Sequence, residues 1–185
     1  MKLVVGLGNP GSKYEGTRHN VGYQVLEELV QRGGGPRKKK AFQGEVAEIT
    51  AQGERILLLW PHTFMNRSGA SVLEARDFYK IETPHILIVC DDFNLPLAKL
   101  RIRATGSSGG QKGIADIIRV LGTEDVPRMR VGIGAIPDHW EGADYVLGKF
   151  TRQEAPIVAD AMSKAAEAVE SWATRGMQQC MNQYN

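Results

Sequence analysis

The sequence of 185 residues has little cysteine and no long apolar run. Its two cysteines, Cys90 and Cys180, are too few and too far apart for a disulfide framework or a zinc site. No apolar run approaches the length that spans a membrane, and the N-terminus lacks a signal-peptide pattern. Metal-ligand spacing is absent too. We therefore expect a cytoplasmic protein without membrane association and without a metal.

Internal repeats, interdomain linkers and low-complexity tracts are also missing. A chain of this length with 42% hydrophobic residues can bury a sizeable core. The sequence therefore predicts a single domain over residues 1–185.

Positive and negative side chains nearly balance, since the net charge is only +2. The basic residues are nevertheless unevenly spread. One run lies at residues 37–40, in an expected exposed loop, and five arginines lie in the second half: Arg101, Arg103, Arg119, Arg128 and Arg130. Such residues usually form solvated faces. They would indicate a phosphate-binding surface only if they line up on one side of the fold.

Short apolar runs alternate with stretches of helical spacing, which indicates an α/β protein. Strands are predicted at residues 3–5, 41–50, 55–60, 85–90, 99–103 and 128–134. Helices are predicted around residues 25–30, after Ser68, over residues 113–121 and from Thr151 onward. Strand periodicity places Lys99, Arg101 and Arg103 on one side of their strand.

Two glycine patterns suggest other functions. Gly6, Gly8 and Gly11 fit the dinucleotide fingerprint G-x-G-x-x-G, but Pro10 interrupts the loop and no helical periodicity follows it directly. They more simply indicate a tight turn with close backbone approach.

The second pattern, Gly106-x-Ser108-x-Gly110, fits the nucleophile elbow of serine hydrolases, which stays open as an alternative. The strand before it alternates basic and apolar residues, whereas the strand before an elbow is normally apolar on both faces. The loop before a helix suits phosphate binding at least as well.

Polar side chains follow three predicted strands. A glycine-rich loop leads from the first strand to His19. Asn66 follows another strand, just before a helix for which Ser68 is the expected cap, and Asp91 and Asp92 end a third. Ligands bind at such strand ends in α/β sheets. Because unpaired buried carboxylates are costly, we expect one of the two to cap a loop and the other to face a histidine.

Four stretches share one pattern in order. They are Gly6-Leu-Gly-Asn-Pro-Gly with Tyr14 and Thr17-Arg-His-Asn-Val-Gly, then Pro61-x-Thr63-x-Met65-Asn66-x-Ser68-Gly69, then Asp91-Asp-x-x-Leu95-Pro96 followed by Arg-x-Arg-x-x-Gly-Ser-x-Gly-Gly, and then Arg128-x-Arg130-x-Gly132-Ile-Gly134. This set resembles the motifs of the bacterial-type peptidyl-tRNA hydrolase family. The resemblance implies a twisted mixed β-sheet with helices on both faces. It also implies peptidyl-tRNA as the partner, no cofactor, no obligate protein partner and a monomer.

The resemblance also implies roles for individual residues. His19 and Asp91 would be catalytic. Substrate binding would fall to Asn9, Tyr14, Phe64, Asn66 and Lys112, and tRNA-backbone contacts to Arg101, Arg103 and Arg130. Gln111-Lys112 stands where the family usually has His-Asn.

These residue types suit hydrolysis of the ester that joins a peptide to the terminal ribose of tRNA. The reaction needs a base for water and donors for the developing oxyanion. An imidazole such as that of His19 can take the proton, oriented by a carboxylate, and the amides of Asn9 and Asn66 can donate to the substrate. A non-catalytic RNA-binding relative remains an alternative, although it would not need His19 or Asp91.

Overall fold

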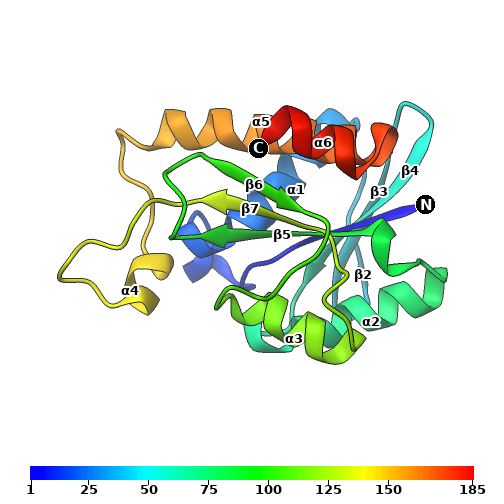
Figure 1. The fold of residues 1–185 in the computed structure, drawn as a ribbon, viewed down its shortest axis with the longest axis horizontal. Helices are drawn as coiled ribbons and strands as arrows, with labels where there is room; N and C mark the ends of the chain where they lie inside the picture. The colour runs from blue at the N-terminus through cyan, green and yellow to red at the C-terminus, as the bar shows by residue number, and fades with distance from the viewer.

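The computed structural model describes residues 1–185, in which seven strands form one mixed sheet (Figure 1). The strands are β1 (Lys2–Gly6), β2 (Lys39–Ala41), β3 (Gly44–Ala51), β4 (Glu54–Pro61), β5 (Ile86–Asp92), β6 (Leu100–Arg103) and β7 (Arg128–Gly132). Their order across the sheet is β2-β3-β4-β1-β5-β7-β6. The predicted α/β class and mixed sheet are confirmed.

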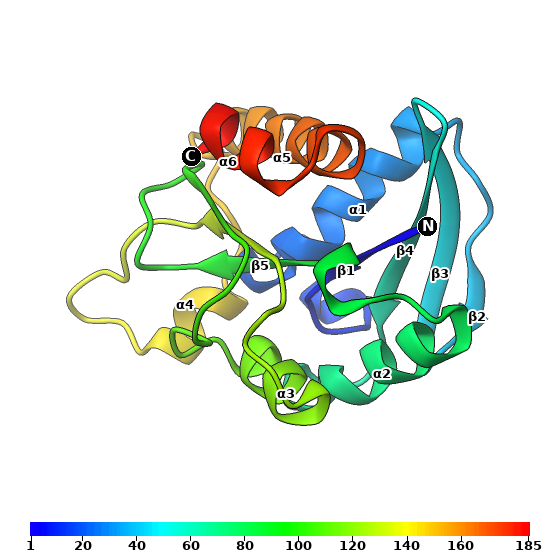
Figure 2. The same ribbon diagram turned by 45° about the vertical axis from the view of Figure 1, so that its right-hand side comes forward.

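The centre of the sheet is parallel and its two edges are antiparallel. β1 pairs with both β4 and β5 in parallel, and β5 continues in parallel to β7. β2, β3 and β4 form antiparallel pairs at one edge, and β6 runs antiparallel to β7 at the other. The continuous apolar runs occupy the central strands because a parallel strand is buried on both faces. Figure 2 shows the twist, with β3 and β4 turned well away from β5.

Helices cover both faces of the sheet, as Figures 1 and 2 show. One face carries α1 (Val21–Arg32), α5 (Ala155–Arg175) and α6 (Met177–Tyr184), and the other carries α2 (Ser68–Tyr79) and α3 (Lys112–Leu121). The short α4 (Gly142–Leu147) lies beyond the arrowheads of β5 and β7 (Figure 1). Four 3-10 turns complete the fold: η1 (Ser12–Tyr14), η2 (Arg18–Asn20), η3 (Met65–Arg67) and η4 (Thr83–His85). None of the helices has the length and apolar composition needed to cross a bilayer.

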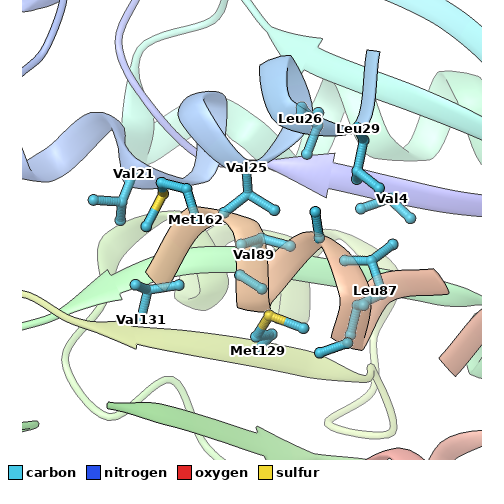
Figure 3. Packing of buried hydrophobic residues seen from close by; sticks show 14 of the residues in the cluster. Val4, Val21, Val25, Leu26, Leu29, Leu87, Val89, Met129, Val131 and Met162 are labelled. Atoms are coloured by element: carbon cyan, nitrogen blue, oxygen red, sulfur yellow. The ribbon is translucent and has the colours of Figure 1, made fainter. Parts of the chain in front are cut away.

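Each face of the sheet has its own hydrophobic core, since successive side chains of a strand point to opposite faces. Figure 3 shows the larger core, where Val4 and Val89 of the sheet meet Val25 of α1 and Met162 of α5. Leu3, Val5 and Ile88 point the other way, toward α2 and α3. Burying a side chain of this size stabilises the fold by about 1.5–3 kcal/mol.

Two glycines let α1 lie directly against the sheet. A Cβ atom on Gly6 would stand 2.4 Å from the carbonyl oxygen of Gly22, and one on Gly22 would stand 2.5 Å from the backbone nitrogen of Leu7. Any side chain at either position would push the helix away. This close approach holds η2, and with it His19, over the carboxyl ends of β1 and β5, and it confirms the close backbone approach predicted for the first glycine.

The strand predicted at residues 41–50 was wrong at its start. Lys39 and Lys40 do not lie in a loop, because they belong to the edge strand β2. Phe42 is not a strand residue either: it lies with Gln43 in the β2–β3 turn, where both have positive φ angles. A pattern of apolar positions does not reveal such a turn, since neither residue is glycine or asparagine.

Two helix boundaries also differ from the prediction. Ser68 does not cap α2 from outside, since it is the first helical residue and its hydroxyl donates to the Met65 carbonyl at 2.9 Å. The turn η3 runs straight into the helix and replaces the cap. The terminal helix is two helices, which Gly176 separates with φ at 89°.

Candidate active site

A cleft of about 460 Å³ opens at the carboxyl ends of the parallel strands. Its polar lining includes Asn9 from the loop after β1, Asn66 from η3 and Asp91 from β5, while α4 forms the opposite wall. Strand ends meet at this edge because β4, β1, β5 and β7 run in the same direction. The location is the one expected for a ligand site in an open α/β sheet.

His19 and Asp91 meet in this cleft, although they are 72 residues apart in the sequence. Nδ1 of the imidazole lies 2.8 Å from Oδ2 of the carboxylate, with 17% of the histidine side chain exposed and 4% of the aspartate side chain. An ionised carboxylate only accepts hydrogen bonds, so Nδ1 carries the proton. In the neutral ring Nε2 is then the free basic nitrogen.

Asp92 has different partners from its neighbour. Its Oδ1 accepts from the backbone N–H of Asn94 at 2.7 Å, and its Oδ2 lies 3.5 Å from Nη1 of Arg130. Adjacent strand residues point to opposite sides, which is why only one of the two carboxylates reaches His19. Asp92 thus shapes the loop that follows β5.

Asn9 and Asn66 both line the cleft, and neither side chain is used in a hydrogen bond within the protein. Asn20 fixes the backbone of Asn9: it accepts from the N–H at 2.9 Å and donates to the C=O at 2.9 Å. The amide of Asn9 is therefore free for a substrate. Phe64, with 65% of its surface exposed, and Leu147 of α4 give the cleft an apolar side.

A second cavity of about 290 Å³ adjoins the cleft, and the two share Asp92, Asn94, Gly109 and Arg130. Its other main residues come from the antiparallel pair β6–β7, whose register places Arg101 opposite Arg130 and Arg103 opposite Arg128. Like charges directly opposite one another destabilise a strand pair, so their grouping indicates an anion-binding surface. We call Arg101, Arg103, Arg128 and Arg130 the arginine face.

Comparison with known proteins agrees with this geometry. The model of the family described as "Peptidyl-tRNA hydrolase" matches residues 3–185. The chain belongs to the peptidyl-tRNA hydrolase family.

Its relatives match it along the whole chain. It is 48% identical to the peptidyl-tRNA hydrolase of Rhodopirellula baltica, with 100% of this chain and 97% of that protein covered. It is 46% identical to that of Desulfitobacterium hafniense, with both chains fully covered. The crystal structure of peptidyl-tRNA hydrolase from Acinetobacter baumannii superposes with a TM-score of 0.92 at 35% identity, over 100% of this chain and 94% of that one.

Not every residue expected from this family lies in the cleft. Tyr14 does not line it: the tyrosine is in η1, with the Lys13 ammonium 4.7 Å from the centre of its ring. Lys112 does line the cleft, as the exposed first residue of α3. Arg101 and Arg103 are exposed, whereas Arg130 is half-buried and donates to the Ser108 carbonyl at 2.6 Å.

Arg128 differs from the other members of the arginine face. It is buried, and its guanidinium donates to the backbone carbonyls of Gly106, Ser107, Glu124 and Val126. Burial, and after it the neighbouring Arg130, lower the pKa of Arg128. Arg128 therefore holds the glycine-rich loop in place and is not available to a ligand, whereas Arg119 pairs with Asp116 on α3 and lies outside the face.

The serine-hydrolase alternative finds no support in the geometry. The Ser108 hydroxyl has one protein partner, the Gly110 N–H at 3.4 Å, and no histidine. The strand before it, β6, is an antiparallel edge strand and not the central parallel strand of a nucleophile elbow.

Arg18 is a structural support of the site that the sequence did not single out. Its guanidinium makes two bonds to the Glu154 carboxylate, at 3.1 and 2.8 Å, and one to the Ile133 carbonyl at 3.2 Å. The guanidinium also stacks on the rings of Tyr145 and Phe150. We call Arg18, Glu154, Tyr145 and Phe150 together the Arg18 clasp. It joins the turn that carries His19 to α4 and to the start of α5. The role of Asn20 was not predicted either. Its position next to His19 in the sequence does not show that its side chain bonds to the backbone of Asn9.

Proposed function

We propose that the cleft cleaves peptidyl-tRNA with His19 as the general base and Asp91 as the residue that orients it. The observation that carries the proposal is the 2.8 Å contact between these two side chains inside a cleft lined by free amides. The family supplies the substrate: an ester between the carboxyl group of a peptide and the terminal ribose of tRNA.

The arrangement supports a two-stage hydrolysis. Nε2 of His19 takes a proton from water while the water oxygen attacks the ester carbonyl carbon, and the carbonyl oxygen becomes an oxyanion. The amides of Asn9 and Asn66 donate to that oxyanion or to the peptide backbone. The carbon–oxygen bond to the ribose then breaks, and the ribose oxygen receives the proton from the imidazolium. The products are the free peptide and tRNA with its hydroxyl restored.

Asp91 makes this base usable in two ways. It accepts from Nδ1, so that Nε2 is the nitrogen without the proton, and its negative charge stabilises the imidazolium that forms. It also keeps the ring from rotating, since the carboxylate is itself buried.

The tRNA body would follow the adjoining cavity. A substrate with its ester beside His19 brings its backbone phosphates to the arginine face, because the two cavities share a wall. Arg101, Arg103 and Arg130 are the proposed phosphate contacts, with Lys112 at the cleft edge donating to a phosphate or substrate oxygen. Phe64 and the apolar residues of α4 would receive the peptide, and Tyr14 would contact the substrate outside the cleft.

We also propose that the protein works as a monomer in the cytoplasm. Both cysteines are free and buried, as expected in a reducing compartment. Burial raises the pKa of Cys90 and raises the pKa of Cys180 to about 11, so neither thiol is reactive. Light scattering across a range of protein concentrations tests the monomer.

Cleavage of N-acetyl-aminoacyl-tRNA, measured beside free aminoacyl-tRNA, tests the function, and His19→Ala tests the mechanism. The variant should lose at least ~10²-fold in turnover, the lower end for general base catalysis, with little change in tRNA affinity. His85→Ala is the matched control, because His85 is exposed in η4, just before β5, at the opposite end of that strand from Asp91. Near-normal turnover in His19→Ala would refute the proposed base, and tRNA binding without any cleavage by the unaltered protein would favour the non-catalytic alternative.

A further inference from the structure

Gln111 lies beneath the pair His19–Asp91, and three groups contact its side-chain amide: Ile114, Asp91 and Met65, whose sulfur lies 3.4 Å from Nε2. It is the N-cap of α3 and is almost fully buried. Its Oε1 lies 2.9 Å from the backbone nitrogen of Ile114, and its Nε2 lies 3.3 Å from Oδ1 of Asp91. The side chain thus connects the start of a helix to the carboxylate that holds His19.

The orientation of this amide follows from the chemistry of its neighbours. A backbone N–H can only donate, so the atom facing Ile114 must be the amide oxygen. The nitrogen must then face Asp91, where it donates to a carboxylate that can only accept. The reverse orientation would set two donors against each other at Ile114 and two acceptors against each other at Asp91.

Asp91 consequently has one donor for each of its oxygens. Oδ2 accepts from His19 at 2.8 Å and Oδ1 accepts from Gln111 at 3.3 Å, in a position shielded from water. A buried carboxylate with an unused oxygen is costly and can rotate toward another donor. With both oxygens engaged, the plane of the carboxylate is fixed, and so is the direction in which it holds the imidazole.

We infer that Gln111 is a positioning residue for the hydrolysis, acting through Asp91 on His19. The inference rests on the proposed mechanism and goes beyond it. The contact with the start of α3 fixes which end of the amide faces Asp91. Because Oε1 already accepts from Ile114, the side chain can present only its N–H donor to Asp91. Unlike an imidazole at this position, an amide does not titrate, so the donor persists at every pH at which the protein is folded.

Three variants separate this role from that of a helix cap. Gln111→Ser keeps a capping oxygen at the N-cap, where serine is a preferred residue, but cannot reach Asp91. Gln111→Glu keeps both the length and the capping oxygen, but faces Asp91 with a second carboxylate. Gln111→His restores an N–H donor to the same region.

Turnover of N-acetyl-aminoacyl-tRNA is the first measurement. Gln111→Ser should lower kcat about tenfold, the lower end for a lost hydrogen bond to a charged group, with KM within about twofold. Gln111→His should recover kcat to within about threefold of the unaltered protein. Gln153→Ser, the same exchange at an exposed position, is the control and should change neither constant.

The pH–rate profile of Gln111→Glu is the second measurement. The other charged groups that line the cleft, Asp92, Lys112 and Arg130, are the same in every variant. An added negative charge beside Asp91 favours the imidazolium, so the acidic limb of the profile should move to higher pH. A side chain that capped the helix without facing Asp91 would leave this limb in place.

Normal kcat in Gln111→Ser, an unmoved acidic limb in Gln111→Glu, or a Gln111→His variant no better than Gln111→Ser would each overturn the inference. His19→Ala, assayed in parallel, distinguishes a failure of the proposed mechanism from a failure of the role of Gln111 alone. If it keeps turnover, the proposed mechanism fails together with the role of Gln111. If it is inactive while Gln111→Ser is normal, only the role of Gln111 fails.

Discussion

The cleft that holds His19 and Asp91 lies beside the arginine face, but charged groups are paired in the first and largely unpaired in the second. In and beneath the cleft every buried charge has a partner: Asp91 has two donors, and Arg18 lies between Glu154 and two aromatic rings. On the face, Arg101 and Arg103 are exposed, pair with no carboxylate and stand opposite two further arginines. The pairing in the cleft holds groups in place, whereas the unpaired cations are available to a polyanion.

Exchanging either of the two adjacent aspartates gives the strongest test of this contrast. Asp91→Asn should keep the fold and lower turnover about 10²-fold, because the amide can no longer fix the proton on Nδ1 of His19 or stabilise the imidazolium. The acidic limb of the pH–rate profile should move to lower pH, since a negative charge beside the imidazole is removed. Turnover across a pH series measures both effects.

Asp92→Asn is the matched control for that change. Its carboxylate contacts Asn94 and Arg130 and not His19, so the loss of turnover should be much smaller and the acidic limb should stay in place. If Asp92→Asn moved the limb and Asp91→Asn did not, the two roles would have to be exchanged.

Breaking the buried clasp should affect folding more than chemistry. Glu154→Gln should reduce the free energy of unfolding by about 2 kcal/mol at pH 7, because the buried Arg18 guanidinium loses a charged partner. The hydrogen bond from Arg18 holds the pKa of Glu154 below its ordinary value of 4.5. A carboxyl with a depressed pKa stabilises the fold above its unfolded value, and this stability is lost as pH falls through the folded value.

Unfolding by urea at pH 7 and over the range below pH 4.5 measures this prediction. The variant should be less stable than the unaltered protein at pH 7 and should approach it as the solution is acidified. Glu167→Gln, a change to an exposed carboxylate within α5, the helix that Glu154 precedes, should have little effect at either pH. An equal loss in both variants would show that the clasp contributes nothing specific.

Removing one cation from the arginine face should have the smallest effect and should appear only in binding. Arg101→Ala or Arg103→Ala should weaken tRNA binding about threefold to tenfold and reduce the slope of log K against log salt by roughly 0.7–0.9. Cleavage of a short ester substrate without the tRNA body should be unchanged. Arg119→Ala is the control, since Arg119 pairs with Asp116. If the short substrate is cleaved as poorly as the full one, these arginines act at the ester.

Much of the fold could be predicted from local pattern. The runs in β4 and β5 have strand length and are apolar throughout, so their burial in the centre of the sheet follows from composition alone. The predicted helix over residues 113–121 ends at Gly122 in the left-handed conformation, which glycine adopts without strain. The β2–β3 turn could not be predicted, because Phe42 and Gln43 adopt positive φ angles that only their surroundings impose.

The candidate site was predictable to the level of strand ends and no further. Asn66 and Asp91 follow apolar runs, and the parallel arrangement brings those ends to one edge. Tyr14 belongs to the same motif as His19 but lies outside the cleft, because sequence proximity does not fix the direction of a side chain in a 3-10 turn. Arg128 and Arg130 lie two residues apart on the same side of β7, yet Arg128 is buried against carbonyls and only Arg130 reaches the cleft.

Local sequence pattern is enough to show which residues are available for chemistry and on which kind of element each lies, because strand and helix periodicities depend on near neighbours. Which of these residues meet depends on the three-dimensional arrangement of the elements. The pairing of β1 with β5 brings His19 to Asp91 across 72 residues, and the start of α3 sets the amide of Gln111 against the second carboxylate oxygen. Those contacts depend on the strand order, which no local pattern encodes, and on the close packing of Gly6 against Gly22 of α1.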